Sequence, residues 1–131
     1  MADTYNLNGV WGGRYWYTHA EDVAVPFSAW LGLVEGELTG TTLEPNTFVA
    51  GGAEELDALL RGHVAGDEMV FLKTYSDLDQ EPVFYEGRIL DDGQRITGRW
   101  FFRGPDDWSG QFEMTRTAAK TNASKAVEAK A

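Results

Sequence analysis

Residues 83–103 read VFYEGRILDDGQRITGRWFFR and contain two alternating segments separated by a short polar stretch. In the first segment Val83, Tyr85 and Ile89 share one face of an extended chain, because successive side chains of a β-strand point to opposite sides. The Asp91–Gln94 link carries the Asp and Gly residues typical of a tight turn. The stretch therefore predicts a β-hairpin with one apolar face and one charged face.

The same alternation recurs along the chain and predicts eight strands: Val10–Tyr17, Pro26–Val34, Glu37–Leu43, Leu56–Val64, Met69–Tyr75, Val83–Leu90, Arg95–Arg103 and Trp108–Thr117. The stretch at residues 54–61 could also begin a short helix. Longer loops are expected at His19–Val25 and Glu44–Gly52, and a tight turn at Gly104–Asp107. Short links between successive strands favour antiparallel pairing in sequence order.

Eight such strands predict an all-β fold, a closed antiparallel eight-stranded up-and-down (meander) barrel, since closure leaves no unpaired strand edge. We expect residues 1–117 to form this single barrel domain. Residues 118–131 are rich in Ala and Lys and lack large apolar side chains, so we expect a flexible tail there.

The composition narrows the possible partners. The 131 residues include 11 Lys+Arg and 21 Asp+Glu, which gives a net charge of −10. Such a surface repels nucleic acid and anionic lipid, so neither is expected as a partner. The chain has no cysteine, which fits a reducing compartment, and we expect a cytoplasmic protein. No apolar run approaches the roughly 20 residues that span a membrane, and no secretory signal is recognisable at the N-terminus.

Strand parity separates the aromatic residues into two sets. A charge-free face is expected to line the barrel, and its glycines either leave room for a ligand or allow strong curvature with aromatic rings filling the gaps. On the outer face, parity places Phe71, Tyr75, Phe84 and Phe101 on neighbouring strands. A contiguous apolar patch of this kind marks an interface. We therefore expect a homo-oligomer, a dimer or a tetramer.

Catalytic and metal-binding patterns are weak. His19 and His63 lack neighbours at the spacing of a metal cluster or a catalytic triad. Paired carboxylates are frequent, but they fall in predicted turns, where Asp caps the backbone and keeps the loop hydrated. We expect no enzymatic activity, and hence no catalytic residue, no metal and no cofactor.

Short motifs in strand order resemble a known family. Gly9-Val10-Trp11 resembles the Gly-x-Trp motif of calycin-type barrels, in which the tryptophan closes the base of the barrel beneath a basic residue of the last strand; Arg116 matches that residue. Within this group the chain is most similar to the avidin–streptavidin family. The segment Glu35–Thr41 resembles its third strand, and Ile96–Trp100 its seventh. The resemblance covers about Leu7–Thr117 and implies the barrel fold and a tetramer.

The residues that the family uses to bind biotin mostly do not carry over. The resemblance puts Gly13, Thr42, Leu72, Tyr85 and Phe112 where the family has an asparagine, a tyrosine, two tryptophans and an aspartate. Trp100 alone matches a pocket tryptophan. A site that lacks these polar partners leaves buried ligand groups unpaired. The resemblance therefore implies the fold without tight biotin binding.

These observations lead to two functional hypotheses. The first is a non-catalytic barrel that binds a small, largely apolar ligand in its interior. Its expected binding residues are Tyr15, Tyr17, Thr42, Thr74, Tyr85, Trp100 and Phe112. The second is a structural or interaction module with a filled interior, which acts through its homo-oligomeric outer surface. Both include a structural contact between Trp11 and Arg116 at the barrel base.

Overall fold

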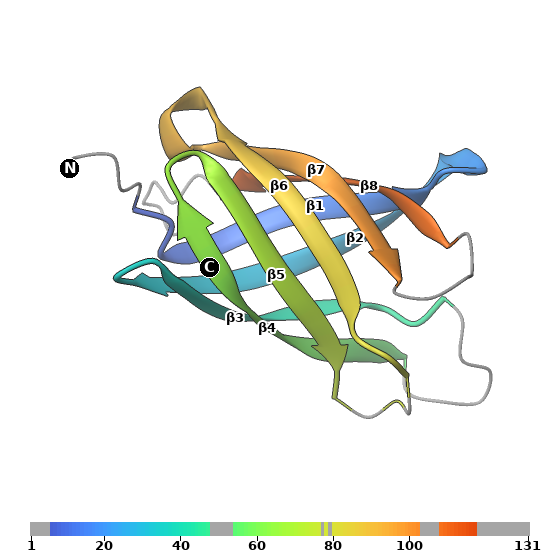
Figure 1. Cartoon of the computed structure of the whole chain (residues 1–131). Helices are drawn as coiled ribbons and strands as arrows, with labels where there is room; N and C mark the ends of the chain where they lie inside the picture. The colour runs from blue at the N-terminus through green and yellow to red at the C-terminus, as the bar shows by residue number, and fades with distance from the viewer. Residues whose placement is uncertain (1–5, 48–53, 77, 79, 103–107, 118–131) are drawn as a thin grey trace, which may run out of the picture.

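The chain folds into a barrel whose strands follow one another in sequence order around the wall (Figure 1). The computed structural model describes residues 6–47, 54–76, 78, 80–102 and 108–117. The strands are β1 (Gly9–Tyr17), β2 (Ala20–Val34), β3 (Glu37–Pro45), β4 (Glu55–Ala65), β5 (Glu68–Tyr75), β6 (Val83–Leu90), β7 (Arg95–Phe102) and β8 (Ser109–Arg116). A 3-10 turn, η1 (Asp91–Gly93), joins β6 to β7.

Each strand pairs antiparallel with the next, and β1 pairs with β8 to close the barrel. The closing register runs from Trp11 opposite Arg116 to Tyr17 opposite Gly110. This arrangement confirms the predicted all-β, eight-stranded antiparallel meander barrel. Closure pairs both edges of the sheet, so no described strand is left as an open edge.

Three segments differ from the sequence-based boundaries. β2 begins at Ala20, so most of the expected His19–Val25 loop is strand. Its register shifts between Trp16 and Tyr17, which indicates a bulge near the β1–β2 turn. β3 continues to Pro45, and β4 is a strand along its whole length rather than a helix. The expected turn at residues 104–107 and the expected tail at 118–131 lie outside the described residues.

The two ends of the barrel are built differently. At one end the short turns after β2, β4 and β6 lie together with the start of β1 and the end of β8 (Figure 1). There the Arg116 guanidinium lies 4.8 Å from the centroid of the fully buried Trp11 ring, the contact that the sequence predicts. Arg116 also donates hydrogen bonds to the carbonyls of Asn6 and Asn8. These contacts close this end of the barrel.

The inward face of β5 is the opposite of the predicted one. Met69, Phe71, Lys73 and Tyr75 are buried in the interior, whereas Val70, Leu72 and Thr74 face outward. The prediction failed because it assigned the face without charged residues to the interior, and Lys73 is a buried charge. Phe71 lies opposite the inward-facing Tyr85 in the β5–β6 ladder, and the two rings stack at a centroid distance of 4.7 Å. Phe71 and Tyr75 therefore belong to the core and not to an outer patch.

Inward glycines mark close approaches between backbone and rings. A Cβ on Gly110 would lie 1.8 Å from the Trp16 carbonyl oxygen and 2.6 Å from Nε1 of Trp100. A Cβ on Gly13 would lie 2.5 Å from the Phe27 ring. At these two positions neighbouring atoms fill the space freed by glycine. The two glycines therefore allow strong strand curvature rather than leave an empty cavity.

Candidate functional site

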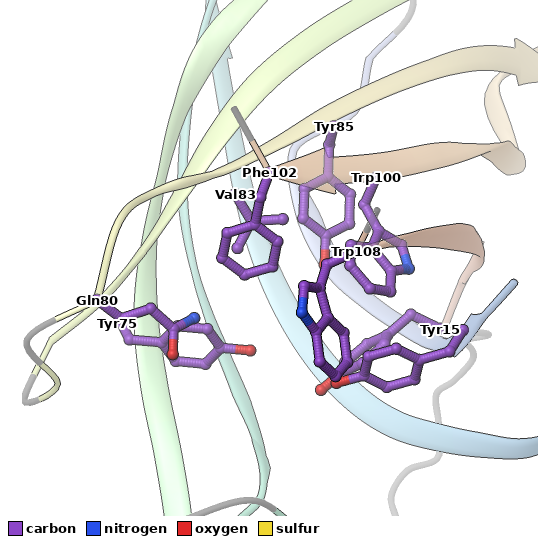
Figure 2. A pocket seen from close by; sticks show the side chains of 9 residues that line it. Tyr15, Tyr75, Gln80, Val83, Tyr85, Trp100, Phe102 and Trp108 are labelled. Atoms are coloured by element: carbon purple, nitrogen blue, oxygen red, sulfur yellow. The ribbon is translucent and has the colours of Figure 1, made fainter. Parts of the chain in front are cut away.

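A cavity of about 360 Å³ opens at the barrel end opposite Trp11, among the ends of β1, β5 and β7 and the starts of β6 and β8. This volume is at the small end of the range for ligand pockets, about 300–1,000 Å³. Figure 2 shows the lining side chains converging on a common space. The lining residues are Tyr15, Tyr17, Tyr75, Gln80, Val83, Tyr85, Trp100, Phe102 and Trp108.

Contacts between rings hold the aromatic wall in place. The Tyr17 ring packs edge-to-face against Trp100, with centroids 5.0 Å apart, and against Trp108, with centroids 5.5 Å apart. Tyr15 packs edge-to-face on Trp100 at 6.0 Å. The Trp100 indole also donates a hydrogen bond to the Trp16 carbonyl at 3.2 Å. Edge-to-face aromatic pairs stabilise each other beyond their apolar area, so this wall is preformed.

Beneath the cavity lies an ion pair enclosed by the barrel. Nζ of Lys73 is 2.5 Å from Oε1 of Glu44, and the two side chains are 2% and 0% exposed. Oε2 of Glu44 accepts hydrogen bonds from the Tyr15 hydroxyl at 2.7 Å and from the Tyr75 hydroxyl at 3.0 Å. Both tyrosines also line the cavity, so they lie between it and the ion pair. A buried charge is tolerated only when it is paired and hydrogen-bonded, as Glu44 is here.

Aromatic rings surround the Lys73 ammonium on the sides not taken by Glu44. Its Nζ lies 4.9 Å from the Tyr75 ring centroid, 5.0 Å from Tyr15, 5.7 Å from Phe27 and 5.8 Å from Tyr85. Burial lowers the pKa of Lys73, and the neighbouring Glu44 carboxylate opposes that shift. Ring faces and a carboxylate thus replace the water that the ammonium loses on burial.

The four tyrosines that line the cavity are held in their neutral form. Burial is the largest cause that raises the pKa of Tyr15, Tyr17, Tyr75 and Tyr85 above the usual tyrosine value. The negative charge of Glu44 raises the pKa of each of them further. Near neutral pH these hydroxyls are therefore protonated and can form hydrogen bonds.

The predicted binding residues fall into three groups. Tyr15, Tyr17, Tyr85 and Trp100 line the cavity. Thr42 and Phe112 are buried inside the barrel but do not line it, and the Thr42 hydroxyl has no hydrogen-bond partner among the described residues. Thr74 faces outward, because β5 has the opposite parity from the predicted one. A binding role for any of these residues stays a prediction.

The sequence predicts neither the ion pair nor five of the nine lining residues. Strand parity places Tyr75 on the outer face, and no pattern marks Gln80, Val83, Phe102 or Trp108 as binding residues. Glu44 was assigned to a loop, yet its parity with the inward Thr42 on a longer strand would have placed it inside. Lys73 points to the same side of β5 as Phe71 and Tyr75. Its burial could have been predicted only by recognising that Glu44 on β3 also points inward and can neutralise it.

The outer wall carries a smaller aromatic cluster than predicted. The Phe84 and Phe101 rings are stacked, with centroids 5.5 Å apart and planes at 12°, and Leu72 lies opposite Phe84 in the β5–β6 ladder. The Arg99 guanidinium covers Phe101 at 4.9 Å from its centroid and bonds to Glu86 at 3.1 Å. Leu72, Phe84 and Phe101 thus form a ridge, partly exposed, across three strands; we call it the outer ridge.

Among the described residues, no group of three or more His, Cys, Asp or Glu side chains is placed to hold a metal ion. His63 lies 3.6 Å from Glu37 on the exposed surface. His19 is exposed and lines a neighbouring hollow together with Tyr17 and Trp108. No helix in the described part of the chain is long and apolar enough to cross a membrane. The chain matches no family model and no curated protein.

Proposed function

We propose that this protein is a non-catalytic barrel that binds a small, largely apolar molecule in the cavity at its open end. The observation that carries the proposal is the preformed aromatic lining, in which Tyr17, Trp100 and Trp108 fix one another by edge-to-face contacts. Mostly apolar walls with a few placed hydroxyls are the usual make-up of a small-molecule site. Ring surfaces that are already ordered spare a ligand part of the entropy cost of binding.

The groups near the cavity do not favour catalysis. A buried carboxylate inside the barrel is the feature that would suggest an enzyme, and Glu44 is such a group. However, Glu44 is bound to Lys73, Tyr15 and Tyr75 at the same time. A carboxylate engaged in this way is a poor general base, because it would have to break several buried bonds to accept a proton. We therefore propose binding without reaction.

The avidin-like relationship is part of the proposal. It is supported by the closed meander and by the Trp11–Arg116 contact. The ligand would nevertheless differ from biotin. A Cβ at Gly13 would lie 2.5 Å from the Phe27 ring, and Phe112 lies against Phe71 and Tyr85, so apolar groups occupy the space at these two sites.

Titration with phenylnaphthylamine, a neutral fluorescent probe of apolar sites, tests the proposal. We expect saturable binding that Trp108→Ala weakens about tenfold, since a ring contact is removed. Trp30→Ala is the matched control, because Trp30 is 46% exposed on the outer wall and Trp108 is 57% exposed at the cavity. Absence of saturable binding, or equal weakening by both substitutions, would overturn the proposal.

A second candidate function is an interaction module that acts through the outer ridge. It is favoured by the stacked Phe84 and Phe101 rings next to Leu72. The partner would be a second copy of this chain. The outer wall also carries the ion pairs Arg99–Glu86 and Arg88–Asp67, and each pair contains one positive and one negative side chain. In a two-fold symmetric dimer, an arginine of one copy could therefore face a carboxylate of the other.

A further inference from the structure

The described residues that line the cavity offer an anion no charged partner. They include no Lys, Arg or His, and Lys73 is separated from the cavity by the Tyr15 and Tyr75 side chains. A ligand carboxylate or phosphate would lose its water there without a charged partner. Burial of an unpaired charge is costly. The protein as a whole also carries a net charge of −10, which disfavours the approach of anions.

The same lining suits a cation. Seven of its nine residues are aromatic. Ring faces carry negative potential, and they attract ammonium groups within about 6 Å, most strongly when water is excluded. At the mouth the Tyr17 ring is nearly perpendicular to the Trp100 ring and to the Trp108 ring, so both ring faces and ring edges are presented there. A cage of this kind is a typical recognition site for ammonium ions.

The ion pair beneath the cavity determines which hydrogen bonds the Tyr15 hydroxyl can offer to a ligand. The Tyr15 hydroxyl donates its proton to Glu44, so towards a ligand its oxygen can act only as an acceptor. Glu44 and Lys73 are 2.5 Å apart, so each compensates the charge of the other and the pair is neutral overall. What the floor of the cavity offers a ligand is the acceptor oxygen of Tyr15, which favours a hydrogen-bond donor such as an ammonium group.

The barrel already contains an ammonium in a similar environment. Lys73 is enclosed by Tyr15, Tyr75 and Tyr85, and these three side chains also line the cavity. Their rings thus already contact a positive charge on the inner side of the site, where Glu44 balances it.

We propose that the ligand of this cavity is an organic cation, an ammonium group carried on a small apolar body. The proposal rests on the proposed binding function and specifies its ligand class. Three probes with the same aromatic body test it: phenethylammonium, phenethyl alcohol and phenylacetate, which are cationic, neutral and anionic at neutral pH. Each is measured by its displacement of bound phenylnaphthylamine. We expect the cation to bind about tenfold more tightly than the alcohol, and phenylacetate to bind least.

Substitution at Gln80 sharpens the test, because Gln80 lines the cavity from the β5–β6 loop and is not part of the ion-pair network. Gln80→Lys brings a positive charge to the lining and should reverse the order of phenethylammonium and phenylacetate. Gln80→Met, the uncharged control of similar length, should preserve the order.

The outcomes separate the two proposals. If phenylnaphthylamine binds but the alcohol or phenylacetate competes as well as the cation, the ligand class is wrong and the binding function stands. An order of affinities that Gln80→Lys leaves unchanged also overturns the cation proposal, since charge would then not decide binding. If phenylnaphthylamine shows no saturable binding, the binding function itself is wrong, and the proposed ligand class is wrong with it.

Discussion

Glu44 on β3 and Lys73 on β5 form an ion pair across the barrel interior, with 2.5 Å between Oε1 and Nζ. The two residues are on strands that are not neighbours in the wall, so the pair links β3 and β5 through the core. Tyr15 of β1 joins them through its hydroxyl. This link separates the closed end of the barrel from the aromatic cavity.

The first prediction concerns this pair. Glu44→Gln should destabilise the fold by about 3–5 kcal/mol, because it leaves the buried Lys73 ammonium without its countercharge. The double variant Glu44→Gln with Lys73→Met should regain most of that loss, since neither neutral side chain carries the desolvation penalty of a buried charge. Urea unfolding followed by tryptophan fluorescence measures both. Equal stability of the single variant and the wild type would show that the pair contributes little.

The second prediction concerns the closed end. Trp11→Ala removes a fully buried ring that contacts the Arg116 guanidinium. It should cost roughly 3–5 kcal/mol, because the neighbouring strands cannot collapse into the space. Trp30→Ala on the outer wall is the control and should change stability little. Thermal unfolding compares the two variants, and an unchanged melting temperature for Trp11→Ala would contradict the prediction.

The third prediction concerns alkaline pH. The pKa of Tyr15, Tyr17, Tyr75 and Tyr85 is raised by burial and by Glu44, so the folded state keeps protons that the unfolded chain loses near pH 10. The stability that these tyrosines contribute is complete below about pH 10 and falls as the pH rises above it. Each retained proton lowers the free energy of unfolding by about 1.4 kcal/mol per pH unit.

Tyr85→Phe isolates this effect, because the variant and the wild type share Lys73 and the other three tyrosines. The variant should lose stability less steeply between about pH 10 and 11.5 in urea unfolding. Parallel pH profiles for the two proteins would mean that Tyr85 ionises alike in the folded and unfolded chains.

The fourth prediction concerns assembly through the outer ridge. Phe84→Glu combined with Phe101→Glu replaces two stacked rings with two negative charges. This double variant should be a folded monomer by light scattering. Each buried Phe contributes on the order of 1.5–3 kcal/mol to an apolar interface. Thr97→Glu, an outward substitution on the same strand, is the control and should leave the assembly intact. A wild-type protein that is monomeric at high concentration would rule out this interface.

Local pattern was enough to predict the fold. Alternation in segments such as Val83–Leu90, and the Asp-Gly turn that follows, fixed strand positions and antiparallel order, because both signals act within a few residues. The Trp11–Arg116 contact followed from the resemblance of Gly9-Val10-Trp11 to a family motif, whose basic partner Arg116 matches. Boundaries were less accurate: β2 and β3 extend into expected loops, since pairing with neighbouring strands orders residues that turn-like composition alone would leave irregular.

The sequence by itself therefore determined an eight-stranded barrel with an aromatic interior and Tyr15, Tyr17, Tyr85 and Trp100 on its inner face. Only the tertiary structure decided that Lys73 and Tyr75 point inward and that Thr74 points outward. The physical reason is that burial of Lys73 depends on Glu44, which is 29 residues away in the sequence but 2.5 Å away in the barrel. A charged side chain keeps its strand face out of the core only when no opposite charge is available there. Closure of the barrel brings Glu44 to Lys73 and so allows this face of β5 to be buried.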